Sequence, residues 1–160
     1  MGLSVAVRSL GYCVAEAPLF ATEWGIKHIK SNSNDEILER TRELLHWERP
    51  DVVVIENYAG EGSRRSRRMQ EVIKAIVALA ISLGIIVKAY SRGVIRECFA
   101  SFGAYTKYEI ATVLARMVPC LRSKLPRRKP RAWENEPRAM ALFDAAALLM
   151  AHYKLGGWSP

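Results

Sequence analysis

The chain has 160 residues, of which half are apolar and a quarter are charged. This composition predicts one globular domain over residues 1–160 and excludes disordered and fibrous proteins. The 24 Lys and Arg residues outnumber the 16 Asp and Glu residues, so the net charge is +8 and a negatively charged partner is expected.

The first half of the chain shows strand patterns before helix patterns. Residues 3–7, 11–15 and 22–29 are predicted strands of an antiparallel meander. Ser33 and Glu36 form a capping-box pattern for a helix that Pro50 ends. Residues 51–56 read DVVVIE, and such a β-branched run is typical of a strand that is covered on both faces.

The second half alternates helices and strands after a Gly-containing loop. Gly84 ends a helix that begins near Ser63, and Thr106 with Glu109 forms a second capping box. The remaining predictions are a strand over 85–90, helices over 92–100 and from Thr106 to Pro119, an irregular stretch over 119–134, and a last helix from Asn135 or Pro137 to Tyr153. This order predicts an α/β fold with a mixed five-stranded sheet, in which an antiparallel three-strand meander joins parallel strands and helices cover both faces.

Two segments carry the excess positive charge. The first basic segment, residues 64–68, contains Arg64, Arg65, Arg67 and Arg68, and the second basic segment, residues 122–131, contains Arg122, Lys124, Arg127, Arg128, Lys129 and Arg131. Without these ten residues the chain has 14 basic and 16 acidic residues. Both segments are predicted to contact nucleic-acid phosphates without reading base sequence, although each alone is equally well explained as a solvated surface.

Three charged residues stand out by their position. Glu56 ends the apolar strand over 51–56, where α/β sheets place their sites, although it is equally the first solvated residue after the strand. Asp144 lies inside the apolar run MALFDAAALLMA, where an unpaired carboxylate is costly, so it indicates either a functional group or a structural ion pair. Lys107 opens a helix, where the helix dipole disfavours a cation, which favours an anionic ligand.

These segments together resemble the RuvC family of Holliday-junction resolvases, which have a ribonuclease-H-like fold. The resemblance rests on SVAVRSLGYCVAE near the start, VVVIEN with Glu56, TKYEIA with Lys107, and FDAAALLMAH with Asp144. It covers about residues 3–153. It implies a metal-dependent, structure-selective endonuclease that hydrolyses phosphodiesters in branched or four-way-junction DNA as a homodimer.

The resemblance also implies a site built from carboxylates. Glu56 and Asp144 would bind Mg²⁺ or Mn²⁺ for in-line attack on a phosphodiester, and Lys107 would contact a phosphate. The basic residues placed at the DNA are Arg64, Arg65, Arg67, Arg68, Lys107, Arg127, Arg128 and Lys129. The family context and the scattered cysteines Cys13, Cys98 and Cys120 predict a cytoplasmic, nucleoid-associated protein of bacterial or phage type.

The sequence departs from the family pattern at two expected carboxylates. The first-strand Asp, which would bridge two metal ions, falls at Ser4, and the acid one turn before Asp144 falls at Ala141. Glu134 or Glu136 is the nearest substitute, and Glu136 is taken as the catalytic candidate. Three interpretations stay open: the chain binds branched DNA without cutting it, Ser4 was introduced to inactivate it, or another acid compensates.

One further class of protein competes with these readings. The second basic segment could serve a protein-interaction or membrane-surface adaptor, but it is Pro-rich and lacks the apolar face of an amphipathic membrane helix. The longest central uncharged stretch, residues 75–87, is too short to span a bilayer. No membrane association is therefore expected.

Overall fold

The computed structural model describes residues 1–31, 33–60 and 63–156 and contains a five-stranded mixed sheet. The strand order is β3-β2-β1-β4-β5, with β1 antiparallel to β2 and parallel to β4. The strands are β1 (Gly2–Ala6), β2 (Ser9–Ala17), β3 (Phe20–His28), β4 (Val52–Glu56) and β5 (Ile86–Tyr90). The predicted fold class is confirmed.

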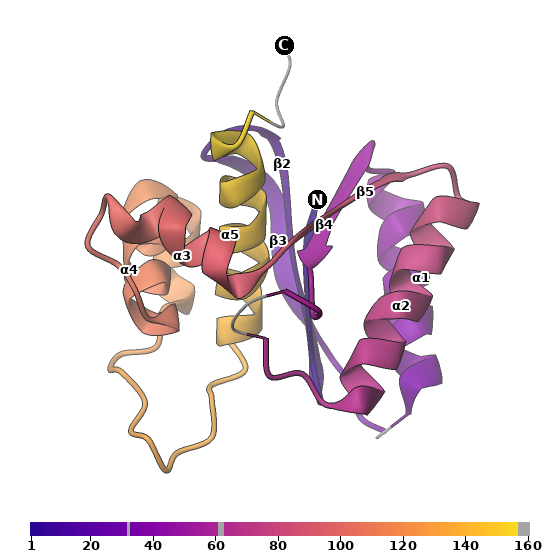
Figure 1. The fold of residues 1–160 in the computed structure, drawn as a ribbon, viewed down its shortest axis with the longest axis horizontal. Helices are drawn as coiled ribbons and strands as arrows, with labels where there is room; N and C mark the ends of the chain where they lie inside the picture. The colour runs from indigo at the N-terminus through magenta and orange to yellow at the C-terminus, as the bar shows by residue number, and fades with distance from the viewer. Residues whose placement is uncertain (32, 61–62, 157–160) are drawn as a thin grey trace.

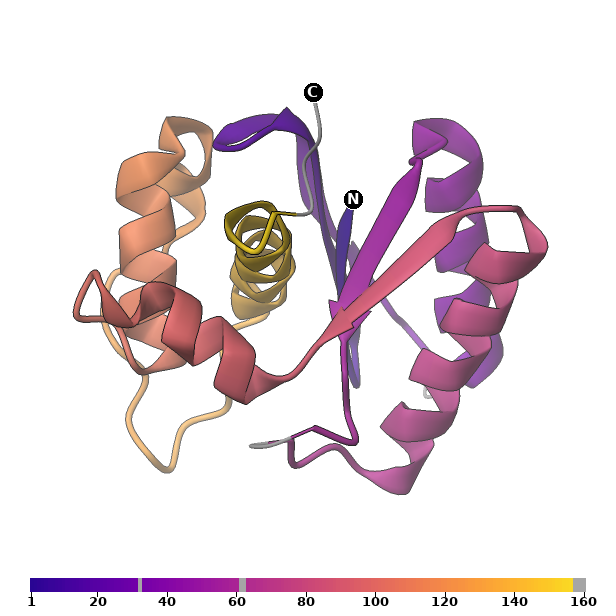
Figure 2. The same ribbon diagram turned by 45° about the horizontal axis from the view of Figure 1, so that its top comes forward.

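Helices cover both faces of the sheet, as Figures 1 and 2 show. The helices α1 (Asn34–Glu48) and α2 (Arg67–Ser82) lie on one face. On the other face α5 (Met140–Lys154) packs against the sheet, with α3 (Arg92–Ala100) and α4 (Lys107–Met117) outside it. No helix within the described ranges is long and apolar enough to cross a membrane.

Several predicted boundaries are wrong, and of the predicted Ser33–Glu36 capping box only the N-cap forms, where Ser33 Oγ accepts a hydrogen bond from the Asp35 N–H. The helix expected from Ser63 begins at Arg67, because Ser66 is its N-cap and accepts a hydrogen bond from the Met69 N–H. The reciprocal half of the Ser33–Glu36 capping box does not form, since Glu36 accepts hydrogen bonds from Lys30 and Ser31 instead. The Thr106–Glu109 capping box is confirmed.

The segment between α4 and α5 also differs from its prediction. Residues Pro119–Lys124 form a 3-10 helix, η1, where irregular structure was expected. The last helix begins at Met140 and not at Asn135 or Pro137. Glu136 therefore lies before the helix, so helical spacing does not set its distance from Asp144.

Strand alternation divides the core into two layers. Leu3 and Val53 point toward α1 and α2 and belong to the core cluster on that side. Gly2 and Val54 are register partners on the parallel strands β1 and β4, and Val54 packs into the cluster around α5. Because side chains two residues apart share a face, Ser4 and Glu56 also face α5.

Two glycines let α5 approach the sheet. A Cβ atom on Gly11 would lie 2.0 Å from the carbonyl oxygen of Ala141, and one on Gly2 would lie 2.1 Å from that of Ala145. Any larger residue at these positions would push the helix outward. The close approach holds Asp144, one residue before Ala145, beside the carboxyl end of β4.

Candidate functional site

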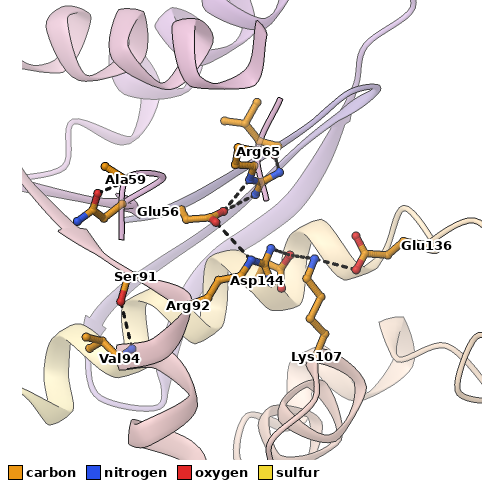
Figure 3. A network of polar contacts seen from close by, with 11 residues as sticks. Glu56, Ala59, Arg65, Ser91, Arg92, Val94, Lys107, Glu136 and Asp144 are labelled. Atoms are coloured by element: carbon orange, nitrogen blue, oxygen red, sulfur yellow. Dashed lines mark hydrogen bonds and ion pairs between the residues drawn. The ribbon is translucent and has the colours of Figure 1, made fainter. Parts of the chain in front are cut away.

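Glu56 ends β4 with a buried side chain that two arginines hold (Figure 3). Arg65 donates from Nε to Oε2 of Glu56 over 2.8 Å and from Nη1 to the Val5 carbonyl oxygen over 2.8 Å. Arg92 donates from Nε to Oε1 over 3.3 Å. Both carboxylate oxygens therefore have a charged donor, which is what a buried carboxylate requires.

Asp144 projects from α5 toward the same place. Its Oδ2 lies 2.8 Å from Nζ of Lys107 and 3.8 Å from Nη2 of Arg92. Burial raises the pKa of the Asp144 carboxyl, and the charges of Lys107 and Arg92 oppose that rise. The lysine that the sequence places unfavourably at a helix start is thus matched by acidic partners.

Glu136 joins this network from the segment before α5. Its Oε1 lies 2.7 Å from Nζ of Lys107, so Lys107 pairs with both Glu136 and Asp144. Glu134, the other acid that could replace the missing carboxylate, pairs instead with Arg128, whose Nη2 lies 2.7 Å from Oε1 of Glu134. The structure therefore brings Glu136 to the site and places Glu134 elsewhere.

Ser4 lies in the middle of β1, the central strand of the sheet, and faces the same side as Glu56. Its side chain is buried and lines a cavity of about 50 Å³ together with Glu56, Asp144, Arg92 and Lys107. The position is where a first-strand carboxylate would meet Glu56, but the hydroxyl adds no charge. Ala141 is also buried, and its backbone touches Gly11.

The residues present do not fit a pair of divalent ions. Within the ranges that the structure describes, no group of three or more His, Cys, Asp and Glu side chains is arranged to hold a metal ion. The two carboxylates of the cavity instead contact guanidinium and ammonium groups. A guanidinium and a divalent ion about 4 Å apart repel each other by roughly 8 kcal/mol at an effective dielectric constant of about 20.

A groove beside this cavity is lined entirely by cations. They come from the stretch before α2, from α3 and from the start of α4, and they are Arg64, Arg65, Arg92, Arg96 and Lys107. Arg64 and Arg96 are exposed, and neither forms an ion pair with any residue that the structure describes. Such a groove can hold phosphate oxygens, since arginine presents its donors in a planar fork.

Sequence reasoning missed Arg92 and Arg96. They are one helical turn apart in α3, which directly follows β5, so they share a face at the carboxyl edge of the sheet. Two arginines four residues apart, directly after a strand, would have indicated a pair of cations on one helix face at the end of that strand. This signal was overlooked because the two residues lie outside the dense basic segments.

The first basic segment divides between two places. Arg64 and Arg65 line the groove. On the surface of α2, Nε of Arg67 lies 3.3 Å from Oε1 of Glu71. Arg68 donates a hydrogen bond from Nε to Oδ1 of Asn34 over 2.8 Å. The structure therefore does not place Arg67 and Arg68 in the lining of the groove.

The second basic segment runs from the end of η1 into a loop that is tied to the start of α4. The Tyr108 hydroxyl donates a hydrogen bond to the Pro126 carbonyl oxygen over 3.1 Å, near the start of this loop. Near the end of the loop, just before α5, Glu136 forms an ion pair with Lys107. Arg127 and Lys129 are exposed, whereas Arg128 makes two hydrogen bonds to Glu134. The loop thus presents exposed positive charge between its contacts with Tyr108 and Lys107.

Comparison with known proteins gives a fold relationship. No protein-family model matches the sequence, and no curated protein matches it either. Thermus thermophilus RuvC in complex with a Holliday-junction substrate superposes with a TM-score of 0.64 and 20% identity, over 99% of this chain and 95% of that one. A further Thermus thermophilus RuvC structure gives a TM-score of 0.64 and 19% identity, over 97% and 95%. The chain therefore has the ribonuclease-H-like fold of RuvC Holliday-junction resolvases.

Proposed function

We propose that this chain binds branched DNA, four-way junctions in particular. The observation that carries the proposal is the five-cation groove, which lies at the carboxyl edge of the sheet in a fold shared with RuvC. The RuvC structure with a Holliday-junction substrate supports the choice of ligand.

Two residues of the groove are the best candidates for phosphate contacts. Arg65, Arg92 and Lys107 are already paired with carboxylates, so they shape the groove and set its potential. Arg64 and Arg96 are exposed, and neither pairs with a carboxylate of the residues that the structure describes. Contacts of this kind fix the position of DNA but carry no base-sequence information.

The second basic segment supplies a separate surface for the DNA. Its exposed cations Arg127, Lys129 and Arg131 lie on the loop that Tyr108 and Lys107 hold in place. Arg131 also makes a cation–π contact, with its Cζ 5.5 Å from the centroid of the Trp133 ring. The groove and the loop are two separate cationic surfaces, and we infer that a junction contacts both.

Binding is tested by comparing a four-way junction with a linear duplex of the same sequence. The double variant Arg64→Gln/Arg96→Gln is expected to weaken junction binding and to reduce the slope of log K against log salt by about 2. Arg40→Gln/Arg42→Gln on α1, on the opposite face of the sheet, is the matched control and is expected to bind as the unaltered protein does. Unchanged affinity in the groove variant would refute the assignment.

Metal-dependent cleavage of the junction, with Mg²⁺ or Mn²⁺, is the second candidate function. The observation in its favour is that Glu56 and Asp144 line one cavity and that Glu136 reaches Lys107 beside it. Ser4→Asp would add the missing carboxylate next to Glu56. This candidate requires the unaltered protein to cleave junctions when Mg²⁺ or Mn²⁺ is added, Ser4→Asp to raise that cleavage, and Asp144→Asn to abolish it.

We also propose that the chain acts as a homodimeric, single-domain protein of the cytoplasm. Dimerisation has apolar surface available where α2 ends and β5 begins, since Ile81, Leu83 and Ile86 are exposed there. Sedimentation equilibrium of the unaltered protein and of Ile81→Glu tests this assembly. A monomer at all concentrations would contradict it.

A further inference from the structure

We propose that the Arg92 guanidinium takes the place of a divalent cation between Glu56 and Asp144. The chain then neutralises these carboxylates itself, and the site does not need a metal ion. This proposal rests on side-chain geometry and does not depend on whether the chain binds DNA.

Arg92 is the link between the two carboxylates. Its Nε lies 3.3 Å from Oε1 of Glu56, and its Nη2 lies 3.8 Å from Oδ2 of Asp144. Figure 3 shows the guanidinium lying between the two acidic side chains. Glu56 ends β4 and Asp144 belongs to α5, so the arginine from α3 joins two elements of the core.

The position of Arg92 is set by its backbone. Arg92 is the first residue of α3, directly after Ser91, whose Oγ accepts the Val94 N–H over 3.3 Å. The loop after β4 packs closely here, since a Cβ atom on Gly60 would lie 2.4 Å from Cβ of Ser91. The guanidinium is thus held against the carboxylates by a capped helix start.

The charges of the site balance without an added cation. The three carboxylates of Glu56, Asp144 and Glu136 are paired with three cations, which are Arg65, Arg92 and Lys107. A carboxylate at position 4 would add a fourth negative charge and create a need for a metal ion. The neutral Ser4 keeps the number of carboxylates at three, and Arg92 is one of the three cations that neutralise them.

The experiment measures Mn²⁺ binding to the protein alone, by the electron paramagnetic resonance signal of free Mn²⁺ and by isothermal calorimetry. The unaltered protein is expected to show no site tighter than millimolar. Arg92→Met keeps the length of the aliphatic stem without the charge, and we expect it to bind Mn²⁺ at least about tenfold more tightly. That gain should be lost in Arg92→Met/Asp144→Asn.

Two further variants keep the result decisive. Arg96→Met, one turn along the same helix, lines the groove but pairs with neither carboxylate, and it should leave Mn²⁺ binding as weak as in the unaltered protein. Arg92→Gln removes the charge but keeps hydrogen-bond donors, and it replaces Arg92→Met if that variant does not fold by circular dichroism. Tight Mn²⁺ binding by the unaltered protein that Asp144→Asn abolishes would overturn the proposal. So would a folded, neutral Arg92 variant that gains no Mn²⁺ affinity.

Discussion

In the first basic segment Arg65 is enclosed in the core network with Glu56, whereas in the second basic segment Arg128 pairs with Glu134 on the surface. The side chain of Arg65 is 16% exposed and its partner 7%, while Arg128 is 62% exposed. Both contacts are arginine–carboxylate pairs of similar length. Their energetic weight differs because water already solvates a surface pair and does not solvate a buried one.

The difference also separates the two segments by role. The first segment supplies the site itself, since Arg65 holds Glu56 and Arg64 opens into the groove. The second segment runs from the end of η1 into a loop that offers exposed cations, and the ion pair between Arg128 and Glu134 orders that loop. A run of arginines in a sequence can therefore be a structural part of a core or a surface for a ligand.

The largest difference between the two segments is expected in how much their arginines contribute to the free energy of unfolding. Arg65→Ala leaves the buried Glu56 short of a partner and removes the donor to the Val5 carbonyl, which should lower the free energy of unfolding by about 3 kcal/mol. Arg128→Ala should leave it unchanged, because the pair with Glu134 is exposed. Urea denaturation measures both. Equal losses in the two variants would break the comparison.

A smaller contrast is expected in DNA binding by the second segment. Arg127→Gln/Lys129→Gln should weaken junction binding and lower the slope of log K against log salt by about 2, with no change in stability. Fluorescence anisotropy with a labelled junction at several salt concentrations gives the slope. If the slope stays the same, this segment makes no phosphate contacts and the groove alone binds the DNA.

The smallest effect is expected when Glu134 is protonated, which should make the backbone of residues 128–134 less ordered. The hydrogen bonds from Arg128 and the Arg131 N–H hold the pKa of Glu134 at about 2, below its ordinary value of 4.5. A depressed pKa means that the contribution of Glu134 to order is present above pH 4.5 and is lost as the pH falls toward 2. Amide protection factors over residues 128–134 should fall in that range.

Glu134→Gln provides the matched comparison for that pH effect. This variant should have low protection at every pH, and trypsin should cut its loop faster at pH 7 while global stability is retained. Cleavage at the same rate in both proteins would show that Glu134 does not order the loop.

The sequence by itself determined most of the elements and singled out Glu56, Lys107, Glu136 and Asp144, which the fold brings together. The meander, the β-branched run ending in Glu56 and the Thr106–Glu109 capping box were predictable, because hydrophobic period and caps are local signals. Asp144 was recognisable because a single acid inside an apolar helix face requires a partner. Helix starts without a strong local cap, such as Met140, were misplaced.

Only the tertiary structure decided how the charges pair. Arg92 meets Glu56 across 36 residues, and Lys107 meets Asp144 across 37 residues. These contacts depend on the strand order and on the close approach of α5 over Gly2 and Gly11, which no local pattern encodes. The choice between a metal-binding carboxylate cluster and a self-neutralised site therefore lay in the packing, because it depends on which cation the fold brings between the carboxylates.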